Sequence, residues 1–195
     1  DIGTTAQAYA EAWLGPEAMF AADAITINPY LGFDSIEPFI RRAQQTLSGV
    51  FVLIRTSNLG TADLQQLLTD GKPIWAHMAA GLGEIVKEQV DPTCALSSVG
   101  IVMGATGPED ALAVRKLLPA APFLIPGFGA QGAKAEEALS GLIADEQKGV
   151  YKGGLVNASR AITHGDGVQN ARTVSEAVTA MKTAIQQAVV DLAFN

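Results

Sequence analysis

The chain is poor in cysteine and in positive charge, and each shortage excludes a class of protein or partner. Its single cysteine, Cys94, cannot form an internal disulfide, so a disulfide scaffold is excluded and a cytoplasmic location is expected. Lys and Arg number 13 against 20 Asp and Glu, and the net charge of −7 argues against a nucleic-acid partner. No apolar run approaches the roughly 18 residues of a membrane span, so no membrane partner is expected either. The start at Asp1 lacks the positive segment of a signal peptide.

Apolar residues, by contrast, are abundant. They make up 48% of the 195 residues, and charged residues only 17%, which predicts one folded domain over residues 1–195. Five short runs are β-branched or Leu-rich with little alternation, as expected for strands of a parallel sheet that are buried on both faces. These predicted strands are 24–28, 50–55, 99–103, 122–126 and 154–157.

Helical spacing of apolar residues fills the segments between these strands. The predicted helices are 4–14, 35–46, 62–68, 73–89, 109–117, 134–145 and 175–193. Alternation of helix and strand predicts a parallel sheet, either doubly wound or closed into a TIM barrel. Gly, Pro, Ser and Asn cluster just after each strand, which favours the barrel. Because a complete barrel takes about 250 residues, we expect an α/β fold holding only about the last five units of a TIM (β/α)8 barrel.

A Gly-rich turn follows the fourth predicted strand and reads PGFGAQG from Pro126 to Gly132. Glycines such as Gly129 let the backbone approach a ligand, and free N–H groups at the start of a helix favour an anion. Gln131 can both donate and accept a hydrogen bond. The turn is therefore either a phosphate-binding turn or a simple strand-to-helix connection.

Small residues also follow the fifth predicted strand, in the run GLVNASRAI that contains Ser159 and Arg160. A guanidinium can grip phosphate through two hydrogen bonds, and the loops after the last two strands are the usual phosphate site of TIM barrels. The alternative is a surface arginine paired with a carboxylate.

Polar residues follow the first two predicted strands as well. Thr56, Ser57 and Asn58 come after Arg55 and either bind a polar heterocycle or serve as ordinary turn residues. After the first strand, Asn28 and Tyr30 can shape the floor of a site. The next helix is expected to be capped by one of two residues there, Asp34 or Ser35.

Metal and nucleophile chemistry find little support in the sequence. His77 and His164 are far apart, and neither has a second His nearby, so no metal site is expected. Cys94 has no evident partner base and is expected to be inert.

Taken together, five strand-end motifs resemble the bacterial second subgroup of orotidine 5′-phosphate decarboxylases. They are NPYLGFDSIEPF, RTSN, VGIVMGAT, LIPGFGAQG and VNASRAI, in the order and spacing of that family. The resemblance implies a TIM barrel that forms homodimers and needs no cofactor. It also implies conversion of orotidine 5′-phosphate into UMP and CO2, a lyase reaction of pyrimidine biosynthesis. The implied substrate-binding residues are Thr5, Ser57, Asn58, Pro126, Gly129, Gln131, Ser159 and Arg160.

The resemblance also assigns roles to several of these residues. Ser57 resembles the serine that hydrogen-bonds the pyrimidine, and Gln131 resembles the glutamine that bridges base and phosphate. The backbone N–H of Ser159 and the side chain of Arg160 resemble the phosphate clamp. Two departures, Leu59 for a common Pro and Ala133 for a common Gly, remove no polar contact.

Asp1 resembles the last residue of the family's catalytic signature Asp-x-Lys-x-x-Asp. The resemblance implies that Asp1 and Thr5 reach into the neighbouring subunit's site, and that the catalytic lysines belong to chain upstream of Asp1. Residues 1–195 alone are therefore expected to be inactive. Two other readings remain: a barrel enzyme acting on sugar phosphates, as a decarboxylase or aldolase, and a non-catalytic nucleotide-binding remnant.

Overall fold

Five parallel strands form the centre of the molecule in the computed structural model, which describes residues 1–19, 21–129 and 131–194. Each predicted strand is present to within a residue or two. The strands are β1 (Ala24–Ile27), β2 (Gly49–Arg55), β7 (Val99–Met103), β8 (Phe123–Pro126) and β11 (Gly154–Asn157).

The order of these strands decides between the two architectures left open by the sequence. A doubly wound sheet reverses its strand order at a switch point, whereas a barrel adds each new strand beside the last one. Here the order β1-β2-β7-β8-β11 follows the chain, and every neighbouring pair is parallel. The fold is thus the later part of a TIM barrel, as predicted.

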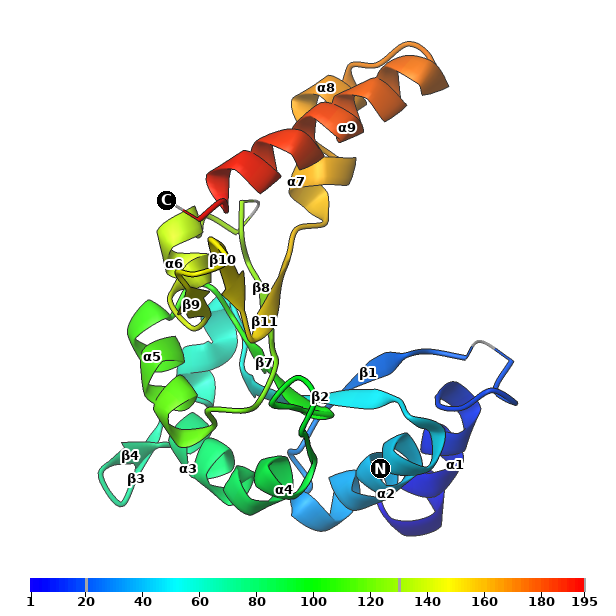
Figure 1. Ribbon diagram of the computed structural model, residues 1–195, viewed down its shortest axis with the longest axis vertical. Helices are drawn as coiled ribbons and strands as arrows, with labels where there is room; N and C mark the ends of the chain where they lie inside the picture. Colours follow the sequence, from blue (N-terminus) through cyan, green and yellow to red (C-terminus); the bar gives the residue numbers. More distant parts are fainter. Residues whose placement is uncertain (20, 130, 195) are drawn as a thin grey trace.

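Helices line the outer side of the curved sheet, and the inner side is open (Figure 1). The side chains of Val50, Val52, Ile101 and Phe123 point into the core between the sheet and the helices. Val114 completes this core from the helix side and has no exposed surface. The helices are α1 (Gly3–Trp13), α2 (Phe33–Thr46), α3 (Ile74–Gly81), α4 (Gly83–Glu88), α5 (Pro108–Leu117) and α6 (Ala135–Leu139).

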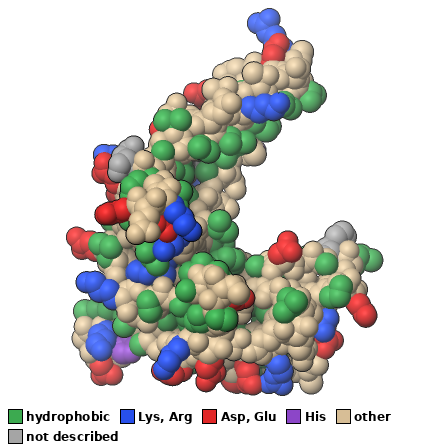
Figure 2. All heavy atoms as spheres, in the orientation of Figure 1, with side chains coloured by type: hydrophobic (Ala, Val, Ile, Leu, Met, Phe, Trp, Pro, Cys, Tyr) green, Lys and Arg blue, Asp and Glu red, His purple; other side chains and the backbone are tan. Residues whose placement is uncertain are grey.

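The chain beyond β11 forms a helical arm that extends away from the sheet (Figure 1). It comprises α7 (Arg160–Thr163), α8 (Asp166–Gln169) and α9 (Val174–Asp191), and no residue of these helices is buried. The predicted helix 175–193 is confirmed as α9. Figure 2 shows that the arm and the β1 end of the molecule flank a broad hollow. Among the described residues, no helix has the length and apolar character needed to cross a membrane.

Two helix predictions were wrong because short hairpins interrupt the helical spacing. Residues 62–68 overlap a 3₁₀ helix, η1 (Leu59–Asp63), and run into the hairpin of β3 (Leu68–Thr69) and β4 (Lys72–Pro73). Asp70 and Gly71 both have positive φ, 49° and 73°, as the Asp-Gly turn of a hairpin requires. That dipeptide was the sequence signal for the hairpin.

The predicted helix 134–145 ends early for the same kind of reason. Its first part is α6, but the chain continues into the hairpin of β9 (Ile143–Asp145) and β10 (Val150–Lys152). The predicted helix 73–89 is split into α3 and α4 at Leu82, and a further hairpin follows, of β5 (Val90–Asp91) and β6 (Leu96–Ser97). Cys94 is exposed in that hairpin's turn.

The capping prediction for α2 was also wrong. The helix begins at Phe33, after Gly32 with φ 102°, so Asp34 and Ser35 lie inside its first turn. The hydroxyl of Ser35 donates to the carbonyl of Gly32 at 2.6 Å. Gly32 adopts the positive φ at the N-cap position, so the helix begins one or two residues before the predicted capping residues Asp34 and Ser35.

Arg115, on α5, ties together the amino-terminal ends of two strands. Its guanidinium lies 3.7 Å from the ring centroid of Phe123 and donates to the carbonyls of Ala121 and Gly153, each at 2.7 Å. It also donates to the carbonyl of Gly141 at 2.8 Å. Burial lowers the pKa of Arg115 to about 10, so the group is still a cation at neutral pH. These contacts anchor β8 and β11, whose far ends carry the two predicted phosphate turns.

Candidate active site

A bulge at the end of β2 shapes the loop that carries Ser57. Leu53 pairs with Val102 and Arg55 pairs with Met103, so β2 has one extra residue at this point. Ile54 and Arg55 are consequently both buried, which breaks the alternation of the strand. Bulges redirect side chains beside functional sites. Here the bulge turns Arg55 inward and leaves the next three residues as a polar loop at the carboxyl end of the strand.

Ser57 and Gln131 meet across this end of the sheet. The Ser57 hydroxyl donates to the side-chain oxygen of Gln131, although 74 residues separate them in the chain. Gly127 makes the approach possible, because a Cβ there would lie 2.9 Å from Cβ of Ser57 and 3.1 Å from Oε1 of Gln131. Gly127 also has φ 109°, a conformation that suits glycine. The loops after β2 and β8 thus join into one polar surface.

The two predicted phosphate turns also lie side by side. A Cβ on Gly129 would lie 3.1 Å from Cβ of Ala161, the residue that follows Arg160. Pro126 pairs with Asn157 across β8 and β11, which fixes the start of both turns at the same level. Ala130, within the Gly-rich turn, lies outside the described residues.

The side chain of Arg160 is exposed at the start of α7, and no carboxylate of the described residues pairs with it. The alternative of a surface arginine held by a described carboxylate therefore finds no support. Ser159, just before it, donates through its hydroxyl to Oδ1 of Asn157 at 3.5 Å. An exposed guanidinium beside a Gly-rich turn is a suitable place for a dianion.

Asn28 and Tyr30, which were expected to shape the floor of a site, lie beside the β2 loop. They line a cavity of about 490 Å³ together with Thr56 and Asn58. The Asn58 side chain is held there, because its Oδ1 accepts from the hydroxyl of Thr56 at 2.6 Å. This cavity adjoins the Ser57 loop at the carboxyl ends of β1 and β2.

Asp1 and Thr5 are not brought to the turns that carry Gln131 and Arg160. Both are exposed at the start of α1, and Asp1 lines a second cavity of about 480 Å³ beside β1, together with Tyr9 and Trp13. Asn28 is the one residue that lines both this cavity and the cavity beside the Ser57 loop, among the described residues. The strand order places β1 at the opposite edge of the sheet from β11, which leads to Arg160. Within one chain, then, Asp1 lies apart from the turns that carry Gln131 and Arg160.

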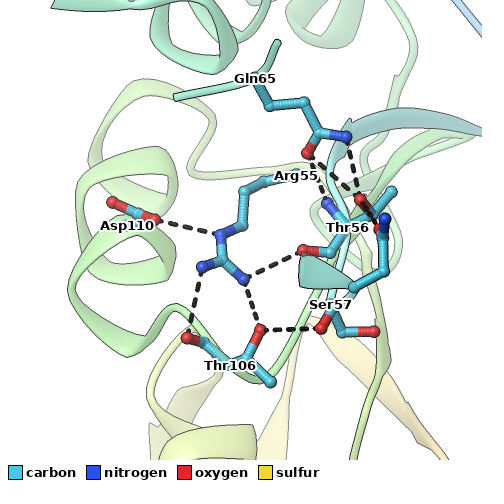
Figure 3. A network of polar contacts seen from close by, with 7 residues as sticks. Arg55, Thr56, Ser57, Gln65, Thr106 and Asp110 are labelled. Atoms are coloured by element: carbon cyan, nitrogen blue, oxygen red, sulfur yellow. Dashed lines mark hydrogen bonds and ion pairs between the residues drawn. The ribbon is translucent and has the colours of Figure 1, made fainter. Parts of the chain in front are cut away.

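Three residues of the site region were missed by the sequence analysis: Gln65, Thr106 and Asp110. Figure 3 shows that they surround the β2 loop with Arg55 at the centre. Gln65 Oε1 accepts from the backbone N–H of Thr56 at 2.8 Å, and its Nε2 donates to the Thr56 hydroxyl at 2.9 Å. Only the Gly-Ala-Thr-Gly run after β7 could have indicated a close approach of the two loops. Among the described residues, no cluster of three or more His, Cys, Asp or Glu is placed to hold a metal.

Strands in sequential order, helices on the outer side and polar loops at the carboxyl ends define a protein of the TIM-barrel class. Residues 1–174 match the model of the orotidine 5′-phosphate decarboxylase / HUMPS family. The chain belongs to that family.

Curated relatives agree with this assignment. The chain is 45% identical over 163 residues to the orotidine 5′-phosphate decarboxylase of Halorubrum lacusprofundi, covering 83% of this chain and 53% of that protein. It is 42% identical over 166 residues to the enzyme of the same name from Rhodopirellula baltica, again covering 83% and 53%. The chain therefore spans about half the length of the curated relatives it matches.

Solved structures give the same picture. A putative orotidine 5′-phosphate decarboxylase from Streptomyces avermitilis is 32% identical with a TM-score of 0.72, over 98% of this chain and 62% of that one. The orotidine 5′-phosphate decarboxylase of Leishmania donovani is also 32% identical, with a TM-score of 0.66 over 99% and 66% of the two chains. These likenesses agree with a partial TIM barrel.

Proposed function

We propose that the protein to which these residues belong decarboxylates orotidine 5′-phosphate to UMP and CO2. The observation that carries the proposal is the contact between Ser57 and Gln131, which joins the loops after β2 and β8 at the carboxyl end of the sheet. The Ser159–Arg160 turn adjoins the same Gly-rich turn through the approach of Gly129 to Ala161. One surface therefore offers groups for a pyrimidine beside groups for a phosphate.

The proposed roles follow from the chemistry of these groups. The hydroxyl of Ser57 and the amide of Gln131 suit the polar edge of a pyrimidine, since both donate and accept hydrogen bonds. Arg160 and the backbone of the turns around Gly129 and Ser159 suit the phosphate. Phosphate binding far from the reacting carbon supplies energy that positions the base for reaction. Pro126 and Asn58 border the base in this arrangement.

The reaction breaks the bond from C6 of the pyrimidine to its carboxylate and leaves the electron pair on C6. CO2 departs, and a proton must reach C6 to give UMP. We assign that proton to the ammonium of the signature lysine, which the family resemblance places three positions before Asp1. Electrostatic stabilisation of the carbanion and proton delivery by a positioned acid are the two contributions that this step requires. No cofactor enters the proposed scheme.

We also propose that two copies of the protein share their active sites. Asp1 lies at the β1 edge of the sheet, apart from the turns that hold Gln131 and Arg160, and Thr5 is exposed on helix α1, which follows Asp1. A side chain placed in this way can complete the site of a second copy. The proposal accounts for both groups of predicted residues with a homodimer.

The test is a binding and turnover measurement on the purified full-length protein, because residues 1–195 alone are expected to be inactive. We expect 6-aza-UMP to bind more tightly than ribose 5-phosphate by calorimetry, and orotidine 5′-phosphate to be consumed with release of CO2. Binding of UMP without any turnover would support a nucleotide-binding remnant instead. Binding of a pentulose phosphate with no affinity for 6-aza-UMP would place the protein among the sugar-phosphate enzymes.

A further inference from the structure

Arg55 is a buried cation beside the proposed site and has no role in the proposed chemistry. Arg55 is only 5% exposed, and its Nε donates to Oδ2 of Asp110, on α5, at 3.1 Å. Burying a charge is costly unless the charge is paired and fully hydrogen-bonded. An apolar residue would fill this part of the core at lower cost, so the contacts that Arg55 makes require an explanation.

Those contacts converge on the loop that carries Ser57. Nη1 of Arg55 donates to the hydroxyl of Thr106 at 2.7 Å and to the carbonyl of Thr56 at 3.0 Å. Nη2 donates to the carbonyl of Thr106 at 3.3 Å. The hydroxyl of Thr106 in turn donates to the carbonyl of Ser57 at 3.4 Å. Figure 3 shows this chain of contacts running from Asp110 through Arg55 and Thr106 to Ser57.

Two glycines in the loop after β7 are shaped around this network. A Cβ on Gly107 would lie 2.5 Å from Cζ of Arg55, and a Cβ on Gly104 would lie 2.6 Å from the backbone nitrogen of Ser57. The backbone of the β7 loop thus lies directly against both the guanidinium and the β2 loop. Because this packing leaves so little space, a change in Arg55 or Thr106 is transmitted to the backbone at Ser57.

We propose that Arg55 and Thr106 form a positioning network that holds the backbone of Ser57 in place, so that its hydroxyl faces Gln131 and the pyrimidine. This inference rests on the proposed function, since it concerns the base-binding part of that site. Arg55 touches no ligand in this arrangement and acts only through Thr106 and the two loop carbonyls. The network therefore favours ligands that carry a base over ligands that carry only the phosphate.

The experiment compares two ligands on matched variants by isothermal calorimetry. UMP reports on the base and phosphate together, and ribose 5-phosphate reports on the phosphate alone. Thr106→Val removes the hydroxyl and preserves the shape of an exposed residue. Thr106→Ser restores a hydroxyl, and Arg55→Lys keeps the charge but loses the planar group. Arg41→Lys is the control, because Arg41 is exposed on α2 and pairs only with Glu37 among the described residues.

We expect Thr106→Val and Arg55→Lys to weaken UMP binding about tenfold, the value of one hydrogen bond of roughly average strength. Ribose 5-phosphate binding should change less than about twofold, Thr106→Ser should restore UMP binding, and Arg41→Lys should have no effect. Equal losses for both ligands, or no rescue by Thr106→Ser, would overturn the proposal. If Arg55→Lys does not fold, the two Thr106 variants decide the result. If the unaltered protein binds no UMP, the proposed function itself fails, which is a different outcome.

Discussion

The hydroxyl of Ser57, at the end of β2, donates a hydrogen bond to the side-chain oxygen of Gln131, in the turn after β8. β7 lies between these two strands in the sheet. The contact therefore reaches across the strand between them and brings a serine and a glutamine into one site. The contribution of Ser57 and of Gln131 to pyrimidine binding can therefore be measured by substituting each residue alone and both together.

Substituting either partner should weaken binding of the pyrimidine. We expect Ser57→Ala and Gln131→Ala each to raise the dissociation constant of UMP about tenfold, because each removes roughly one hydrogen bond to the base. The double variant should raise the dissociation constant by less than the product of the two single increases, since the two residues contact each other. Calorimetry of the four proteins gives this double-mutant cycle, and strictly additive effects would contradict a shared role.

Arg160 should determine affinity for the phosphate. Arg160→Ala is expected to weaken binding of UMP and of ribose 5-phosphate by similar factors, roughly 10- to 100-fold, because a charge-assisted hydrogen bond is lost from both complexes. Arg172→Ala is a matched control, since Arg172 is another exposed arginine of the helical arm. A titration with each ligand checks the prediction, and an unchanged ribose 5-phosphate affinity would show that the phosphate binds elsewhere.

Gly127 should not tolerate a side chain. Gly127→Ala places a methyl group 2.9 Å from Cβ of Ser57 and imposes φ 109° on alanine, so we expect a stability loss of about 1–3 kcal/mol together with weaker UMP binding. Gly132→Ala serves for comparison, because its φ of 90° is similarly unfavourable but no atom lies within 4 Å of its Cβ position. Chemical denaturation measures the stability of both. The same loss of UMP binding in both variants would show that backbone strain, and not the clash with Ser57, is responsible.

Arg115 should contribute to stability and not to ligand recognition. Its guanidinium links α5 to the starts of β8 and β11 through buried carbonyls, so Arg115→Met should lower the free energy of unfolding by about 2–4 kcal/mol. Arg41→Ala, which breaks an exposed ion pair with Glu37, should cost less than about 1 kcal/mol. Urea unfolding followed by circular dichroism compares the two, and equal costs would contradict the anchoring role.

A shared active site predicts complementation between two variants that each have reduced activity when assayed well below KM. In a hybrid of an Asp1→Ala subunit and a Ser57→Ala subunit, one of the two sites has both Asp1 and Ser57 intact. In a statistical mixture, half of the dimers are hybrids with one unaltered site, so about a quarter of all sites should regain full activity above the residual activity of the altered sites. Mixing, refolding and assaying decarboxylation tests this. Activity that stays at the level of the separate variants would place Asp1 in the site of its own chain.

The sequence predicted the strands better than it predicted the short elements between them. Each of the five strands is a short β-branched or Leu-rich run, and in β2 residues such as Val50 and Val52 are buried on the core side. Such runs between helical segments are typical of a parallel sheet. The hairpins were missed because their strands are two or three residues long, too short for a periodic pattern. Asp70-Gly71 was the available signal for one of them.

The candidate site shows the same division. The sequence predicted the phosphate turns because each is a run of small residues that directly follows a strand, which is a local pattern. These runs contain Gln131, Ser159 and Arg160. The partners of Arg55 did not stand out, because Thr106 and Asp110 lie 51 and 55 residues away from it. A contact over that distance depends on which strands are neighbours and on the bulge in β2.

By itself, the sequence determined the class of fold and the polar residues at the strand ends, since buried strands and Gly-rich turns leave local patterns of composition. Only the tertiary structure decided that the strands follow one another in sequential order, as in a barrel. It alone decided that Ser57 faces Gln131 and that Arg55 turns inward toward Asp110. Strand order and loop contacts arise from packing between distant segments, and local sequence carries little record of that packing.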